Sequence, residues 1–127
     1  MSAALPYVGR HLIADLHGCS RLDDAEWIER CLVDAAAAAG ATLLEVRLHV
    51  FGPGQGVTGV ALLAESHISI HSWPEHGYAS VDIFMCGRAH DLEAALDVIA
   101  GRLGGEIRNP ITLSRGYGAG ALVPASI

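Results

Sequence analysis

The chain has 127 residues with a hydrophobic fraction of 51%, and all eight of its basic residues are arginine, giving a net charge of −6. This length predicts one domain over residues 1–127, and the acidic balance argues against a nucleic-acid partner, which would need a basic surface. No apolar run approaches the ~20 residues of a membrane span, residues 1–10 lack the layout of a signal peptide, and the three cysteines have no metal-type spacing, a pattern typical of a protein of the reducing cytoplasm.

The first part of the chain predicts a strand and then a helix. Alternating side chains predict the strand over residues 11–16. Apolar residues then recur at helical spacing up to about Ala39, with Asp23 as the expected N-cap and Glu26 as its acidic partner three residues later. Gly40 supplies the stop signal that often ends a helix.

Four strands are predicted in the middle of the chain. Residues 43–51 alternate between apolar and polar side chains. After a glycine-rich loop, residues 57–64 are almost all apolar, which is typical of a strand buried on both faces. Residues 66–73 and 78–86 then form a predicted hairpin around the Pro-Glu-His-Gly turn.

The last part of the chain predicts a second amphipathic helix over residues 91–103 and a final strand over 106–113. The glycine- and alanine-rich tail, residues 116–127, is expected to be loosely held. The predicted order is β-α-β-β-β-β-α-β. It indicates an α+β fold, a two-layer α/β sandwich with a mostly antiparallel sheet and both helices on one face.

The predicted hairpin separates a polar face from an apolar face, because alternate residues of a strand share a face. Ile68 and Ile70 belong against the helices, so the open face of the sheet carries His67, Ser69, His71 and Trp73. Pairing back from the turn places Ser66 beside Met85 or Cys86, so Ser66 and Cys86 are expected to be neighbours.

The same strand keeps Ser66 and His71 apart. Five residues separate them, or roughly 16 Å at ~3.3 Å per residue. If both side chains act on one centre, His71 must therefore come from a second subunit. A symmetric homodimer would then hold two composite sites at its interface.

The most specific motif of the chain is ESHISIHSWPEHGYASVDIFMCG, which begins at Glu65 and ends at Gly87. It closely resembles the self-cleaving core of the bacterial, pyruvoyl-dependent S-adenosylmethionine decarboxylase proenzymes. The resemblance reaches back through GVTGV around Thr58 to GRHL at residues 9–12, and it fades after about Asp91. Members of this family are homodimers with active sites at the interface.

The resemblance implies self-cleavage between Glu65 and Ser66, giving a β chain of residues 1–65 and an α chain of residues 66–127. Ser66 would become a pyruvoyl cofactor, whose carbonyl condenses with the substrate amine and accepts the electrons released as CO₂ departs. The composition agrees with this chemistry. Pyridoxal phosphate needs a lysine for its attachment, and the chain has none.

By the same resemblance, His71 is the proton acceptor in processing and Cys86 is the proton donor in catalysis. An imidazole that titrates near neutral pH suits the first role. Thr58 corresponds to a serine that assists processing. The expected substrate contacts are Phe51 stacked on adenine, Glu75 on the ribose hydroxyls, and Trp73 in the pocket wall.

Three departures from the family pattern bear on the substrate. Thr58 replaces the common serine, Met85 replaces the threonine that usually precedes the catalytic cysteine, and the loop between Phe51 and Thr58 is slightly longer. The predicted activity is decarboxylation of S-adenosylmethionine, which supplies the aminopropyl donor for spermidine synthesis. The same chemistry on arginine or ornithine is the alternative, although contacts for adenine and ribose have little purpose for a small amino acid.

Two other classes of function are alternatives to this prediction. A metal enzyme would draw its ligands from His67, His71, His76 and Cys86. On a strand, however, His67 and His71 lie ~13 Å apart, too far to hold one ion, so no metal is predicted. A non-catalytic, unprocessed regulatory subunit would have no need for Ser66, His71 and Cys86 together.

Overall fold

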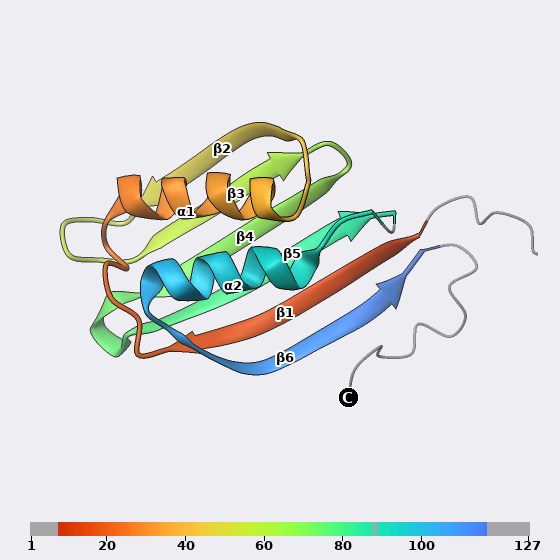
Figure 1. Ribbon diagram of the computed structural model, residues 1–127. Helices are drawn as coiled ribbons and strands as arrows, with labels where there is room; N and C mark the ends of the chain where they lie inside the picture. The colour runs from red at the N-terminus through yellow and green to blue at the C-terminus, as the bar shows by residue number, and fades with distance from the viewer. Residues whose placement is uncertain (1–7, 88, 117–127) are drawn as a thin grey trace, which may run out of the picture.

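The computed structural model describes residues 8–87 and 89–116. The elements are β1 (Gly9–His17), α1 (Ala25–Ala38), β2 (Leu43–Val50), β3 (Val57–Leu63), β4 (Ser66–Trp73), the short 3₁₀ helix η1 (Pro74–His76), β5 (Tyr78–Cys86), α2 (Leu92–Leu103) and β6 (Glu106–Arg115). The six strands form one sheet in the order β2-β3-β4-β5-β1-β6, and every neighbouring pair is antiparallel. Both helices cover the same face of the sheet (Figure 1).

This architecture confirms the predicted two-layer α+β sandwich. The predicted loosely held tail lies outside the described residues from residue 117 onward. Neither described helix has the length and hydrophobicity needed to cross a membrane.

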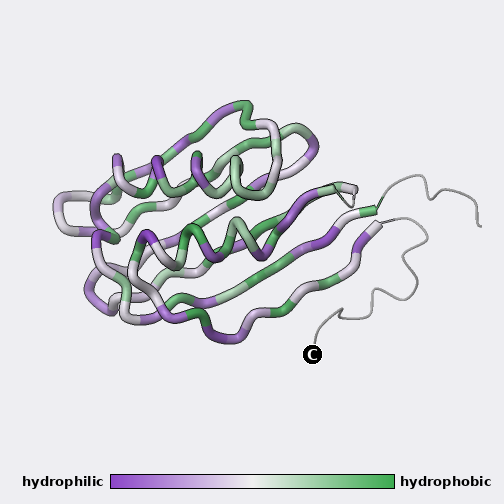
Figure 2. Tube along the Cα trace, viewed as in Figure 1, coloured by the Kyte–Doolittle hydropathy of each residue, from purple (hydrophilic) through white to green (hydrophobic). Residues whose placement is uncertain are grey.

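The core lies between the sheet and the two helices. Hydrophobic and hydrophilic residues are interspersed along most of the strands and both helices (Figure 2), and the buried hydrophobic residues form one cluster. Burying a large aliphatic side chain stabilises the fold by roughly 1.5–3 kcal/mol. The largest fully buried side chains include Leu16, Ile28, Leu32, Ile68, Ile70, Ile83, Ile99 and Leu103.

The start of α1 corrects one prediction. The N-cap is Asp24, not Asp23, because the Asp24 carboxylate accepts a hydrogen bond from the Trp27 backbone N–H at 3.1 Å. Arg21 also binds this carboxylate, at 2.9 Å. The guanidinium of Arg21 and the Trp27 N–H together hold the pKa of Asp24 below its usual range. Glu26 therefore occupies the second helical position.

The burial of β3 corrects a second prediction. Only one face of the strand is buried, with Val57, Ala61 and Leu63 turned towards the helices. Leu62, on the other face, is 42% exposed. The apolar sequence of β3 suggested two covered faces, but both helices of the described chain pack on the same side of the sheet. The open face therefore keeps exposed apolar side chains, including Ile13 on β1.

The β4–β5 hairpin has the predicted register. Trp73 pairs with Tyr78, and Ser69 pairs with Asp82. On β5, Val81, Ile83 and Met85 are buried in the core, whereas Asp82, Phe84 and Cys86 alternate with them on the open face. On β4, His67, Ser69, His71 and Trp73 alternate with the buried Ile68, Ile70 and Ser72, so the side chains predicted to share the open face do so.

Candidate active site

The Glu65–Ser66 peptide bond lies at the tip of the β3–β4 hairpin. Leu63 pairs with Ser66, so Ala64 and Glu65 make a two-residue turn. Glu65 has a φ of 61°, in the left-handed region. This conformation costs an ordinary L-residue roughly 1–2 kcal/mol. The strain lies directly before the bond that the sequence motif marks for cleavage.

Cys86, the last residue of β5, contacts both sides of this bond. Its backbone N–H donates a hydrogen bond to Ser66 Oγ at 3.0 Å, and its thiol donates one to the Glu65 carbonyl oxygen at 2.9 Å. These bonds confirm that Ser66 and Cys86 are neighbours. A donor on a carbonyl oxygen stabilises the negative charge that develops there when a nucleophile attacks the carbon.

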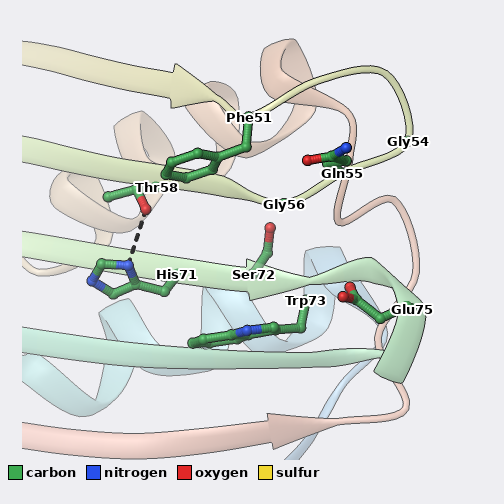
Figure 3. A pocket seen from close by; sticks show the side chains of 9 residues that line it. All are labelled: Phe51, Gly54, Gln55, Gly56, Thr58, His71, Ser72, Trp73 and Glu75. Atoms are coloured by element: carbon green, nitrogen blue, oxygen red, sulfur yellow. Dashed lines mark hydrogen bonds between the residues drawn. The ribbon is translucent and has the colours of Figure 1, made fainter.

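His71 lies towards the other end of β4, where it pairs with Thr58 on β3 and Ser80 on β5. Thr58 Oγ1 is 3.0 Å from His71 Nδ1 (Figure 3). If Nδ1 carries the proton and donates to the hydroxyl, then Nε2 is free to act as a base. Because β4 is unbroken from Ser66 to Trp73, about 16 Å of strand separates His71 from Ser66.

A hollow of 460 Å³ opens beside His71. Phe51 and Trp73 line it from opposite sides, and Glu75 closes one end (Figure 3). Phe51 is 58% exposed and Trp73 39% exposed, so both rings are available to a ligand. Two aromatic side chains across a hollow can stack on a planar group between them. Thr58 also lines this hollow, so five of the predicted site residues meet here.

The predicted site residues thus fall into two groups at opposite ends of β4. Glu65, Ser66 and Cys86 form the cleavage centre, and the other five lie around the hollow. A single described subunit does not bring the two groups together.

Two polar side chains that the sequence did not single out, those of Gln55 and Ser72, also line the hollow. Gln55 presents its side-chain amide to the hollow from the loop after β2 (Figure 3). Ser72 is 7% exposed, and its hydroxyl accepts from the Val57 N–H at 2.9 Å and donates to the Leu22 carbonyl at 2.7 Å, so it fastens β4 to its neighbours. A signal for Gln55 was present, since a polar side chain in a glycine-rich loop beside two strands is often placed to bind a ligand.

A second hollow, of 430 Å³, lies on the open face of the sheet and shares His71 with the first. His11, Asp82 and Ser69 line it. Asp82 binds His11 Nε2 through one carboxylate oxygen and receives the Ser69 hydroxyl on the other, at 3.3 Å. Sequence analysis missed this network because its members come from three different strands.

His11, His67 and Asp82 also bring their potential metal-ligating atoms within 4.8 Å of one another. The hydrogen bonds of His11, however, favour a hydrogen-bonded network over a metal site. Arg115 Nη1 is 3.1 Å from His11 Nδ1 and can only donate, so Nδ1 accepts and the ring proton lies on Nε2, facing Asp82. A histidine metal ligand normally has the opposite arrangement, with its second nitrogen donating to an acceptor. The geometry therefore favours a hydrogen-bonded network.

Comparison with known proteins gives consistent similarities over most of the chain. The family model described as S-adenosylmethionine decarboxylase matches residues 10–116. The chain is 50% identical over 113 residues to an S-adenosylmethionine decarboxylase proenzyme of Anoxybacillus flavithermus, covering 87% of this chain and 90% of that protein. It is 48% identical over 114 residues to S-adenosylmethionine decarboxylase proenzyme 1 of Bacillus cereus, covering 88% and 87%. The crystal structure of an adenosylmethionine decarboxylase from Aquifex aeolicus superposes with a TM-score of 0.74 at 37% identity, covering 91% of this chain and 93% of that one.

Proposed function

Because the chain belongs to the S-adenosylmethionine decarboxylase family, we propose that it is a proenzyme that cleaves itself between Glu65 and Ser66 and then decarboxylates S-adenosylmethionine. The observation that carries the proposal is the pair of hydrogen bonds from Cys86 to Ser66 and Glu65. The product is decarboxylated S-adenosylmethionine, the aminopropyl donor for spermidine in polyamine synthesis.

Maturation starts at the strained turn. Ser66 Oγ attacks the Glu65 carbonyl carbon, the peptide C–N bond breaks, and an ester with a free amino group forms. The left-handed Glu65 and the thiol of Cys86 both favour this step, the first by raising the energy of the intact turn and the second by stabilising the oxyanion.

The second stage of maturation needs a base. His71 Nε2 removes the Cα proton of Ser66, the Cβ–O bond of the ester breaks, and Glu65 leaves with a new carboxyl terminus. The remaining dehydroalanine takes up water and loses ammonia, which leaves a pyruvoyl group at position 66. Thr58, which bonds His71 Nδ1, orients the imidazole for this proton transfer.

The residues present fit a pyruvoyl cofactor. Its chemical contribution is a carbonyl that accepts the electron pair left when CO₂ departs. The thiol of Cys86, in contact with the cleavage site, is placed to return a proton to the product. Phe51 and Trp73 hold the adenine between their rings, and Glu75 accepts hydrogen bonds from the ribose hydroxyls.

The active unit in this proposal is a homodimer. Within the described residues no helix covers the open face of the sheet, which carries exposed apolar side chains, among them Ile13 and Leu62. A twofold axis near the middle of β4 would lay the two strands antiparallel and bring His71 to Ser66 of the partner subunit. Two composite sites would result, each with its cleavage centre from one subunit and its hollow from the other.

The test is a denaturing intact-mass spectrum followed by measurement of CO₂ release from S-adenosylmethionine, arginine and ornithine. The expected result is two chains divided between Glu65 and Ser66, the second without a free amino terminus, and CO₂ from S-adenosylmethionine. The Ser66→Ala variant is the control and should give one uncut chain without activity. Release of CO₂ only from a basic amino acid would assign the alternative substrate, and an uncut, inactive parent chain would favour a regulatory subunit.

A further inference from the structure

Tyr78 lies behind Trp73, which forms one wall of the 460 Å³ hollow proposed to bind the substrate. It pairs with Trp73 across β4 and β5, and their rings stack with centroids 5.1 Å apart and planes inclined by 29°. Trp73 lines the hollow, whereas Tyr78 is not among the residues that line it. The stack therefore supports the indole without closing the hollow, and one side of the indole remains exposed.

Tyr78 is itself held in place by a carboxylate. Its hydroxyl donates to Asp15 Oδ1 at 2.8 Å, and Asn109 Nδ2 donates to Asp15 Oδ2 at 3.2 Å. Both oxygens of Asp15 are thus engaged. The hydrogen bond to Asp15 also raises the pKa of Tyr78, so the hydroxyl stays protonated and remains a donor.

A bulge in the sheet aims Asn109 at Asp15. The pairing of β1 with β6 shifts register between Ile13 and Asp15. Asn109 has a φ of 55° there, a left-handed conformation that asparagine tolerates better than most residues. β-bulges commonly redirect a side chain near a functional site. The chain of contacts Asn109–Asp15–Tyr78–Trp73 consequently crosses four adjacent strands, from β6 to β4.

We propose that Tyr78 is a positioning residue which, anchored by Asp15, holds the Trp73 indole as a rigid wall and thereby sets the affinity for the planar base of the substrate. This inference rests on the proposed role of Trp73 in binding adenine. An indole that is only partly buried can otherwise rotate about its side-chain bonds. Fixing it before the ligand arrives removes an ordering cost from binding.

The test uses Trp73 as its own reporter. The chain has two tryptophans, so a Trp27→Phe background leaves Trp73 alone. Tyr78→Phe keeps the stacked ring but loses the bond to Asp15, and Tyr78→Leu loses both. Arg108→Gln is the matched control, since Arg108 pairs with Asp15 in the β1–β6 register but its guanidinium bonds Glu106. The measurements are acrylamide quenching and anisotropy of Trp73 without substrate, the rate of self-cleavage, and kcat and KM for S-adenosylmethionine.

The expected result for Tyr78→Leu is greater quenching, lower anisotropy, and a KM raised by about 2- to 10-fold with kcat and the cleavage rate unchanged. Tyr78→Phe should shift the same quantities less, and Arg108→Gln should shift none. Unchanged quenching and anisotropy in both Tyr78 variants would overturn the inference, even for a protein without turnover. A more mobile Trp73 with an unchanged KM would instead overturn the link to substrate affinity and the role assigned to Trp73. If Tyr78→Leu does not fold, Tyr78→Phe decides.

Discussion

The thiol of Cys86 donates a 2.9 Å hydrogen bond to the carbonyl oxygen of Glu65, so the residue expected to protonate the product also touches the bond expected to break. In the proposed mechanism the two roles belong to different stages, since the Glu65 carbonyl would leave with the β chain on cleavage. They can therefore be separated by measuring each stage in the same variants.

Cys86→Ala should still cleave, slowed by less than about tenfold, because a thiol is a weak hydrogen-bond donor. Its decarboxylation rate should fall by about 10²-fold or more, as for loss of a general acid. Cleavage is followed by intact mass and catalysis by CO₂ release. The control is Cys86→Ser, which keeps a donor on Glu65 and should cleave nearly as fast as the parent. Normal CO₂ release from the cleaved alanine variant would exclude Cys86 as the proton donor.

Glu65→Gly should slow self-cleavage by about 2- to 10-fold and stabilise the uncut chain, because glycine adopts a positive φ without the strain that drives the turn to open. The measurements are the cleavage rate and the thermal unfolding of the uncut protein in a Ser66→Ala background. Arg21→Gly is the control: Arg21 has a φ of 60° but lies in the turn before α1. A slower cleavage in the Arg21 variant as well would show that the effect is not specific to the scissile bond.

Mixing Ser66→Ala with His71→Ala tests the composite site. Each variant alone should remain uncut, the first without a nucleophile and the second stalled as an ester. In a mixed dimer, Ser66 of the His71→Ala chain would meet His71 of the Ser66→Ala chain. After exchange at equal concentrations about half of the His71→Ala chains should therefore be cleaved. The readout is the mass of the tagged His71→Ala chain. No cleavage in verified mixed dimers would mean that the two residues do not act across the interface.

Thr58→Val should slow cleavage by about tenfold or more, because His71 loses the hydroxyl that holds its Nδ1. Valine has the shape of threonine, so Thr58→Val keeps the packing of β3. The control is Thr58→Ser, which keeps the hydroxyl and should cleave at nearly the parent rate. Rates are taken from the appearance of the 66–127 fragment over time. Equal rates in the valine and serine variants would remove Thr58 from processing.

Alkylation should distinguish Cys86 from the buried Cys31. Burial raises the pKa of the Cys31 thiol to about 11, and the side chain is only 1% exposed. Burial also raises the pKa of Cys19. A raised thiol pKa means less thiolate at a given pH, so iodoacetamide at pH 8 should label Cys86, which is partly exposed, well before Cys31. Peptide mass mapping gives the order, and labelling in denaturant, where all three should react, is the control. Faster labelling of Cys31 in the folded protein would contradict its burial.

The sequence was sufficient for the local features of the fold. Alternation at period 2 predicted the strands and which side of β4 and β5 faces the core, helical spacing predicted both helices, and Gly40 marked the end of α1. The cleavage motif and the absence of lysine pointed to the same chemistry. These signals are local, because the period of side chains along a segment is set by the backbone of that segment.

Tertiary structure decided the features in which distant segments meet. The apolar sequence of β3 could not show that both helices pack on one side, which leaves Leu62 exposed. The sequence as a whole also could not show that a bulge on β6 turns Asn109 towards Asp15. Nor could it show that Asp15 anchors Tyr78, which lies behind Trp73. The sequence thus determined which residues are proposed to carry the chemistry and the spacing that keeps Ser66 and His71 apart on one strand. Only the strand order and register decided which side chains support them, because contacts between strands depend on pairings made across the whole chain.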